Sequence, residues 1–319
     1  MSGDPFPQTV VAVVWDFDKT LSPRYMQEPM FAAYGIDADT FWAETRGLAE
    51  HCRRSGLAHV SRDTLYLNHL LTYVQAGRLP GLTNARLREF GAQITFFPGL
   101  PEALQRLKSL VASRPDWRQH GITLEHHVVS NGLYEMIRGC GLAAQLDGIW
   151  GCEFIEAPPP PGYLPQAASL PTAGPAIAQV AYAIDNTTKT RAIFEINKGS
   201  NTDPSIDVNA AMDESKRRVP MRQMIYVADG PSDIPVFSLI QRNGGRCFAV
   251  YDADDRGAFK QANELNRQQR VDAFGPADYR PGTQTSLWLE SEVTRIADEI
   301  AQRRSRLVAA SAVKPPSSY

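Results

Sequence analysis

The stretch Val10–Thr20, VVAVVWDFDKT, decides the fold. Its first six residues are continuously apolar and mostly β-branched, which is typical of a strand buried on both faces of a parallel sheet. The run stops at Asp16, and Asp18 follows two residues later. Two carboxylates at one strand end repel each other, and a divalent cation offsets that repulsion. Hard oxygen ligands in small number favour Mg²⁺. The alternative is an ordinary turn, in which Asp and Thr are common.

A second carboxylate pair follows another apolar run. Residues 224–228, MIYVA, predict a strand that stops at Asp229, and Asp233 lies four residues further on. Gly230 permits a sharp turn between them. These two residues fit a metal site, although Asp233 could also simply cap the helix that follows.

Two other predicted strands are followed by groups that can bind an anion. Residues 124–129 predict a strand that ends at Ser130, and the turn continues with Asn131 and Gly132. A hydroxyl and backbone N–H groups at a strand-to-helix turn suit anion binding, although Ser130 could instead cap the helix. After the strand expected at 177–184, Lys189 supplies an ammonium that can neutralise phosphate. Lys198, at the far end of the next helix, is its rival.

The whole chain alternates strands with helices, which predicts an α/β fold with a doubly wound, Rossmann-like parallel sheet. In such sheets ligands bind beyond the carboxyl ends of the strands, where these polar residues would meet. We expect a core domain over 1–24 and 97–312 and a helical insertion over 25–96. Seven prolines lie between 157 and 175, which predicts an exposed loop rather than a central strand. Residues 313–319 are expected to form a tail.

Composition excludes several classes of protein. The 319 residues carry 33 Lys and Arg against 35 Asp and Glu, a net charge of -2, which argues against nucleic-acid binding by bulk charge. The apolar run at 10–15 is too short to cross a membrane, and no basic segment precedes it as in a secretory signal. The four cysteines do not form a CxxC pair. We therefore expect a cytoplasmic protein with reduced thiols and no membrane partner.

The order DxDxT, Ser, Lys and DGxxD resembles the haloacid dehalogenase-like superfamily of phosphohydrolases over roughly residues 10–300. The DFDKTL form of the first motif resembles the phosphoserine-phosphatase-like branch. The helical insertion lies where that superfamily places its first type of cap domain. Ala228 departs from the pattern, because many members have Gly before this Asp.

The resemblance implies a Mg²⁺-dependent phosphomonoesterase that acts on a small phosphorylated metabolite. Asp16 would be the nucleophile and form an aspartyl-phosphate. Asp18 would act as general acid and base, and Thr20 would orient Asp18 or the loop by hydrogen bonding. The remaining roles fall to two groups. The metal would be held by Asp16, the Asp18 carbonyl, Asp229 and Asp233, and the phosphoryl oxygens by Ser130, Asn131, Gly132 and Lys189.

Other readings stay open on the sequence. The same scaffold could transfer phosphate to an acceptor other than water, act on a phosphoprotein, or serve as a non-catalytic phospho-acceptor. Carbon–halogen hydrolysis is less favoured, because it needs no proton donor two residues after the nucleophile. The oligomeric state is open, as is the choice of residues in the insertion that meet the leaving group. The candidates are Arg24, Tyr25, Arg46, His51, Arg53, Arg54 and His59.

Overall fold

The computed structural model describes residues 7–312, which form a seven-stranded sheet in the order β4-β3-β2-β1-β5-β6-β7. The deciding strand β1 lies at its centre, parallel to β2 on one side and β5 on the other. This arrangement confirms the α/β fold with a doubly wound sheet. The strands are β1 Val10–Trp15, β2 Thr123–Leu133, β3 Gly148–Ile155, β4 Gln179–Tyr182, β5 Met224–Ala228, β6 Arg246–Tyr251 and β7 Ala273–Pro276.

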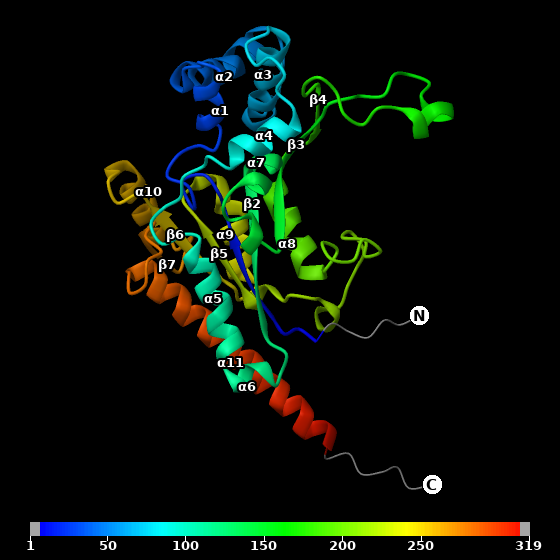
Figure 1. Cartoon of the computed structure of the whole chain (residues 1–319). Helices are drawn as coiled ribbons and strands as arrows, with labels where there is room; N and C mark the ends of the chain where they lie inside the picture. The colour runs from blue at the N-terminus through cyan, green and yellow to red at the C-terminus, as the bar shows by residue number, and fades with distance from the viewer. Residues whose placement is uncertain (1–6, 313–319) are drawn as a thin grey trace.

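Helices cover both faces of this sheet, as the alternating pattern predicts (Figure 1). Helices α5 and α11 pack together on one face, and α8, α9 and α10 contribute buried side chains to the other. The helices are α1 Glu28–Ala33, α2 Ala38–Arg54, α3 Arg62–Gln75, α4 Asn84–Gly91, α5 Glu102–Ser113, α6 Pro115–Arg118, α7 Tyr134–Gly139, α8 Thr188–Lys198, α9 Ile234–Arg242, α10 Arg256–Arg267 and α11 Gln284–Ala312.

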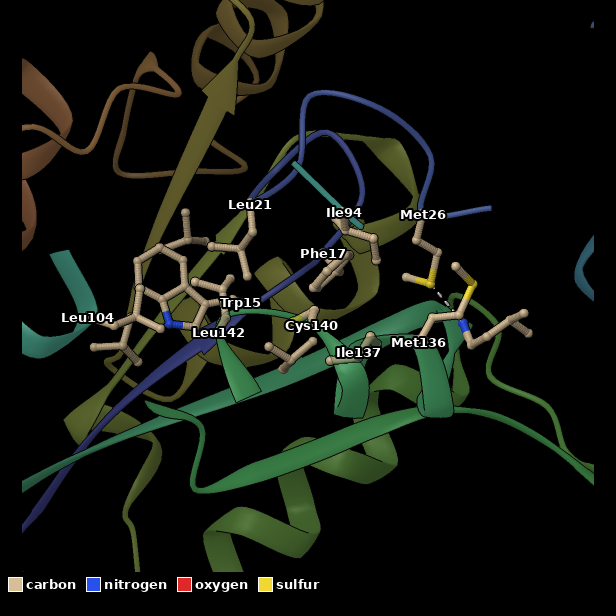
Figure 2. Packing of buried hydrophobic residues seen from close by; sticks show 14 of the residues in the cluster. Trp15, Phe17, Leu21, Met26, Ile94, Leu104, Met136, Ile137, Cys140 and Leu142 are labelled. Carbon is tan, nitrogen blue, oxygen red and sulfur yellow. Dashed lines mark hydrogen bonds between the residues drawn. The ribbon is translucent and has the colours of Figure 1, made fainter. Parts of the chain in front are cut away.

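Strand β1 is buried along its whole length because its side chains serve two hydrophobic cores. Val11, Val13 and Trp15 belong to the core beneath α5 and α11, whereas Val10, Ala12 and Val14 belong to the opposite core. This alternation follows from the two-residue period of a strand. Figure 2 shows Trp15 close to Leu104, and Phe17 close to Ile94 and Ile137. The end of β1 is therefore fixed by packing on both sides.

One strand departs from the expected parallel arrangement. We expected a strand over 177–184, but β4 covers only Gln179–Tyr182, lies at the sheet edge and runs antiparallel to β3. The reason is the connection between them. The proline-rich segment 157–175 forms only a short 3₁₀ helix, so the chain returns beside β3 without a helical crossover. In Figure 1 this green segment projects away from the sheet.

The helices α1–α4 lie over the carboxyl ends of β1 and β2 (Figure 1). Side-chain caps begin three of them: Asp37 for α2, Ser61 for α3 and Thr83 for α4. Two glycines bring α4 against α7. A Cβ on Gly91 would clash with the Met136 carbonyl, and one on Gly139 would clash with the Arg88 carbonyl. This close contact fixes the helical segment on the rest of the molecule.

The expected tail, 313–319, lies outside the described residues. Between residues 7 and 312, no helix is both long and apolar enough to cross a membrane.

Candidate active site

The predicted residues meet around the ammonium group of Lys189. Asp16 directly follows β1, and its backbone N–H donates to the Val227 carbonyl of β5 at 2.9 Å. Lys189 Nζ lies 2.8 Å from Asp16 Oδ1 and 2.7 Å from Asp233 Oδ1. The segments that follow the parallel strands β1 and β5 thus meet at the carboxyl edge of the sheet, and the first turn of α8 brings Lys189 to the same point.

Lys189, and not Lys198, is the lysine of this site. It lies in the first turn of α8 and is 1% exposed. Burial acts to lower the pKa of Lys189, but the negative charges of Asp16 and Asp233 outweigh it and raise that pKa above its ordinary value. Lys198 lies at the other end of α8, where it donates to the carbonyls of Val208 and Ala210. That contact holds the polar segment after α8 in place.

The carboxylate of Asp233 is fully engaged by donors of the protein. Besides Lys189, the hydroxyl of Tyr226 donates to Oδ1 at 2.5 Å, and Ser232 Oγ donates to Oδ2 at 2.7 Å. Asp233 is 0% exposed, so these bonds compensate for its burial. Sequence reasoning missed Tyr226, because a tyrosine inside an apolar strand gives no sign of polar contact. Asp233 therefore fixes the position of Lys189.

Asp229 has the opposite character. None of the side chains in residues 7–312 donates a hydrogen bond to its half-buried carboxylate. One carboxylate oxygen from each of Asp16, Asp229 and Asp233 lies within 4.8 Å of the others. Burial, followed by the charges of Asp16 and Asp233, raises the pKa of Asp229 well above its ordinary value. A small divalent cation would supply the missing positive charge, so the donor set fits Mg²⁺.

Asp16 and Asp18 have different environments. Burial raises the pKa of Asp16 to about 6 although Lys189 acts in the opposite direction, so most of this carboxyl is ionised at pH 7. Burial, and then the charge of Asp16, raise the pKa of Asp18 to about 8. The backbone N–H of Met26 holds Asp18 Oδ1 at 2.9 Å. The pair thus combines an ionised carboxylate with a carboxyl that keeps its proton near neutral pH, which is an arrangement for nucleophilic and acid catalysis.

The expected hydrogen bond from Thr20 to Asp18 is not formed. The Thr20 hydroxyl is buried and forms no hydrogen bond with the described residues. The backbone of Thr20 has the structural role instead, because its carbonyl accepts a 2.6 Å hydrogen bond from the Tyr279 hydroxyl. Tyr279 was not predicted, because it lies 259 residues away in the chain.

Ser130, Asn131 and Gly132 line the same cavity as the carboxylates. Ser130 Oγ accepts from the Gly132 N–H at 3.0 Å, which tightens the turn at the end of β2. A side chain on Gly132 would clash with Met26. Asn131 Nδ2 donates to Asp63 Oδ1 of α3 at 2.9 Å, which joins the sheet edge to the helical segment.

The cavity has a volume of about 610 Å³ and extends from the carboxylates to α1–α3. Among the seven predicted leaving-group residues, only Tyr25 and Arg46 line it. Trp42, Arg62 and Tyr66 also line it and were missed, because helical periodicity alone does not tell which end of a helix faces a cavity. The helical segment therefore contributes aromatic, basic and acidic side chains to the site.

Comparisons with known proteins concern the family and the fold of the whole chain. No family model matches the chain. An uncharacterized protein of Borreliella burgdorferi is 32% identical over 289 residues, which cover 90% of this chain and 97% of that protein. A probable phosphoserine phosphatase from Vibrio cholerae shares the fold, with a TM-score of 0.50 and 12% identity over 92% of this chain and 68% of that chain.

A phosphoserine phosphatase with a phospho-aspartyl intermediate analogue is also similar, with a TM-score of 0.47 and 15% identity over 89% of this chain and 99% of that chain. A dehalogenase with a bound intermediate has a TM-score of 0.42 and 12% identity over 88% of this chain and 97% of that chain. The chain belongs to one family with the Borreliella burgdorferi protein, and its fold is that of the haloacid dehalogenase-like hydrolases.

Proposed function

We propose that the protein is a Mg²⁺-dependent phosphomonoesterase that works through an aspartyl-phosphate on Asp16. The observation that carries this proposal is the position of Lys189 Nζ between Asp16 and Asp233, with Asp18 two residues after the nucleophile. A buried ammonium beside a carboxylate nucleophile supplies positive charge where a phosphoryl group develops negative charge.

The reaction has two steps. An oxygen of Asp16 attacks phosphorus, the bond from phosphorus to the alcohol oxygen breaks, and Asp18 gives its proton to that oxygen. The ionised Asp18 then accepts a proton from water, whose oxygen attacks the same phosphorus and releases phosphate and Asp16. Lys189, Ser130 and the N–H group of Asn131 bind the phosphoryl oxygens, and Gly132, whose N–H donates to Ser130 Oγ, shapes the turn that presents them.

We assign the metal to the carboxylates of Asp16 and Asp229 and the backbone carbonyl of Asp18, with Asp233 holding the surrounding groups. Bound Mg²⁺ would neutralise the charge that phosphate adds to a site already containing carboxylates. The unpartnered carboxylate of Asp229 supports this assignment most directly, since Asp233 is already saturated by Lys189, Tyr226 and Ser232.

Residues 25–96 would act as a cap domain over a core domain of 1–24 and 97–312, and the substrate would be a small phosphorylated metabolite. Residues of helices α1–α3 line the same cavity as the carboxylates, which supports this division. The four cysteines are free thiols, which supports a reducing compartment such as the cytoplasm.

Asp18 favours phosphate ester hydrolysis over dehalogenation. An alcohol leaving group needs a proton, and Asp18 keeps one near neutral pH because burial and Asp16 raise its pKa to about 8. A halide leaves without protonation, so a dehalogenase has no use for such a residue.

Hydrolysis of p-nitrophenyl phosphate with and without Mg²⁺ tests the proposal. We expect turnover that requires the metal and falls by at least about 10³-fold in Asp16→Asn, because the nucleophile is lost. Asp213→Asn is the matched control, since Asp213 is exposed and distant from the cavity. Turnover that survives in Asp16→Asn contradicts the proposed nucleophile.

A further inference from the structure

Three aromatic side chains of the cavity lining, Tyr25, Trp42 and Tyr66, form one wall. The rings of Tyr25 and Trp42 lie 5.1 Å apart at 45°, and those of Trp42 and Tyr66 lie 5.5 Å apart at 38°. Tyr25 is 44% exposed although its ring lines the cavity. Lys19 Nζ lies 5.1 Å from the centre of the Tyr25 ring, and the exposed part of that ring offers a flat ligand a place to stack beside a polar site.

Two guanidinium groups at the same cavity have no hydrogen-bond or ion-pair partner among the described residues. Arg46 of α2 and Arg62 of α3 both line it and are exposed. Within residues 7–312, neither forms an ion pair or a hydrogen bond. By contrast, Arg24 at the neighbouring surface pairs with Glu28. Free guanidinium groups are planar, bidentate donors for the acceptor atoms of a ligand.

Two polar atoms on this wall also lack partners. Trp42 Nε1 and Gln27 Oε1 are buried and form no hydrogen bond with the described residues. A buried polar group without a partner costs about 1–3 kcal/mol. A ligand that presents both acceptors and donors has the groups to satisfy them.

Building on the proposed phosphatase function, we propose that the substrate class is phosphomonoesters whose alcohol carries a flat heteroaromatic ring, with nucleoside monophosphates as the type. The phosphate binds beside Asp16 and Lys189. The ring stacks on the wall formed by Tyr25 and Trp42, and its polar edge accepts from Arg46 and Arg62. The cavity of about 610 Å³ is in the range of sites that enclose ligands of this size.

The test compares four nucleoside 5′-monophosphates (adenosine, guanosine, cytidine and uridine) with ribose 5-phosphate, which carries a hydroxyl in place of the base. We expect kcat/KM for at least one nucleotide to exceed that for ribose 5-phosphate by about 10-fold or more, because stacking of a base on an aromatic side chain contributes on that scale. Values no higher than that of ribose 5-phosphate for all four nucleotides overturn the proposal.

Variants locate the effect on the wall. Tyr25→Leu should raise KM for the preferred nucleotide by about 5- to 100-fold and raise that for ribose 5-phosphate by a clearly smaller factor. Tyr163→Leu, in the proline-rich segment, is the matched control, because Tyr163 is also partly exposed and lies outside the cavity. Arg46→Gln should act in the same direction, whereas Arg54→Gln at the end of the same helix should not. Equal effects of Tyr25→Leu on both substrates contradict the stacking.

A binding measurement separates this proposal from the phosphatase function. Calorimetric titration of Asp16→Asn with the same nucleotides and with ribose 5-phosphate requires no turnover. Metal-dependent hydrolysis of p-nitrophenyl phosphate without nucleotide preference would leave the phosphatase function standing and overturn the substrate class. Tighter binding of a nucleotide than of ribose 5-phosphate, without hydrolysis of any ester, would support the ring-binding wall and overturn the phosphatase function.

Discussion

Replacing Lys189 by Met removes the only ammonium that separates the carboxylates of Asp16 and Asp233 among the described residues. Lys189 Nζ lies 2.8 and 2.7 Å from them and is buried at 1% exposure. Removing one partner of a buried ion pair costs about 3–5 kcal/mol, because the remaining charge is uncompensated. Domain stability is about 5–15 kcal/mol, so the metal-free variant would lose a large part of it.

The loss should depend on pH in a defined direction. Without Lys189 the ionised form of Asp16 is further disfavoured in the folded protein, so the cost is largest at pH 8. It becomes smaller as the pH falls and the Asp16 carboxyl takes up a proton. Mg²⁺ should also reduce the cost at pH 8 by replacing the lost positive charge.

Urea unfolding in EDTA, followed by tryptophan fluorescence at pH 8 and pH 5.5, measures this effect. Lys198→Met is the matched control on the same helix. It loses hydrogen bonds to two carbonyls, so a smaller cost of about 1–2 kcal/mol without pH dependence is expected. A loss below about 1 kcal/mol for Lys189→Met at pH 8, or an equal loss at both pH values, would refute the reasoning.

Three further predictions concern the neighbouring residues. In metal-free protein, Asp18 in the unfolded chain ionises near 3.8, whereas the folded protein keeps this proton up to about 8. The free energy of unfolding should therefore fall as the pH rises between these values. Urea unfolding from pH 5 to 8 should show a smaller fall in Asp18→Asn than in the unmodified protein, and an equal fall in both proteins contradicts the prediction. Mg²⁺ should raise Tm, and Asp229→Asn should need about tenfold more Mg²⁺ for the same rise, whereas Asp213→Asn should need no more than the unmodified protein. Thr20→Val replaces a buried, unpartnered hydroxyl, so the unfolding free energy should stay equal or rise by about 1 kcal/mol; a clear loss would reveal a partner.

The sequence predicted which strands are followed directly by candidate catalytic or metal-binding residues. Continuous apolar runs identified β1 and β5, so Asp16 and Asp229 could be placed at one sheet edge. The choice between Lys189 and Lys198 could not be made, because both lie near helix ends and only the fold shows which end faces the carboxylates. The geometry places Lys189 in the site and Lys198 outside it.

What the sequence could not predict depends on contacts distant in the chain. Tyr226 and Tyr279 are buried in apolar surroundings, and only their hydroxyl partners reveal their roles. The antiparallel β4 was missed because its direction is set by the segment 157–175, which lacks a crossover helix. We expected a hydrogen bond from the Thr20 side chain, but the contact is made by its backbone carbonyl. The sequence could not show this, because it does not give the conformation of the loop.

Trapping the covalent intermediate tests the central claim most directly. The enzyme is mixed with Mg²⁺ and p-nitrophenyl phosphate, quenched in acid and reduced with borohydride, which converts an aspartyl-phosphate to homoserine. Peptide mass spectrometry should find homoserine at position 16 alone, and only when both metal and substrate were present. Turnover without any reduced residue, or reduction at another aspartate, would contradict the account.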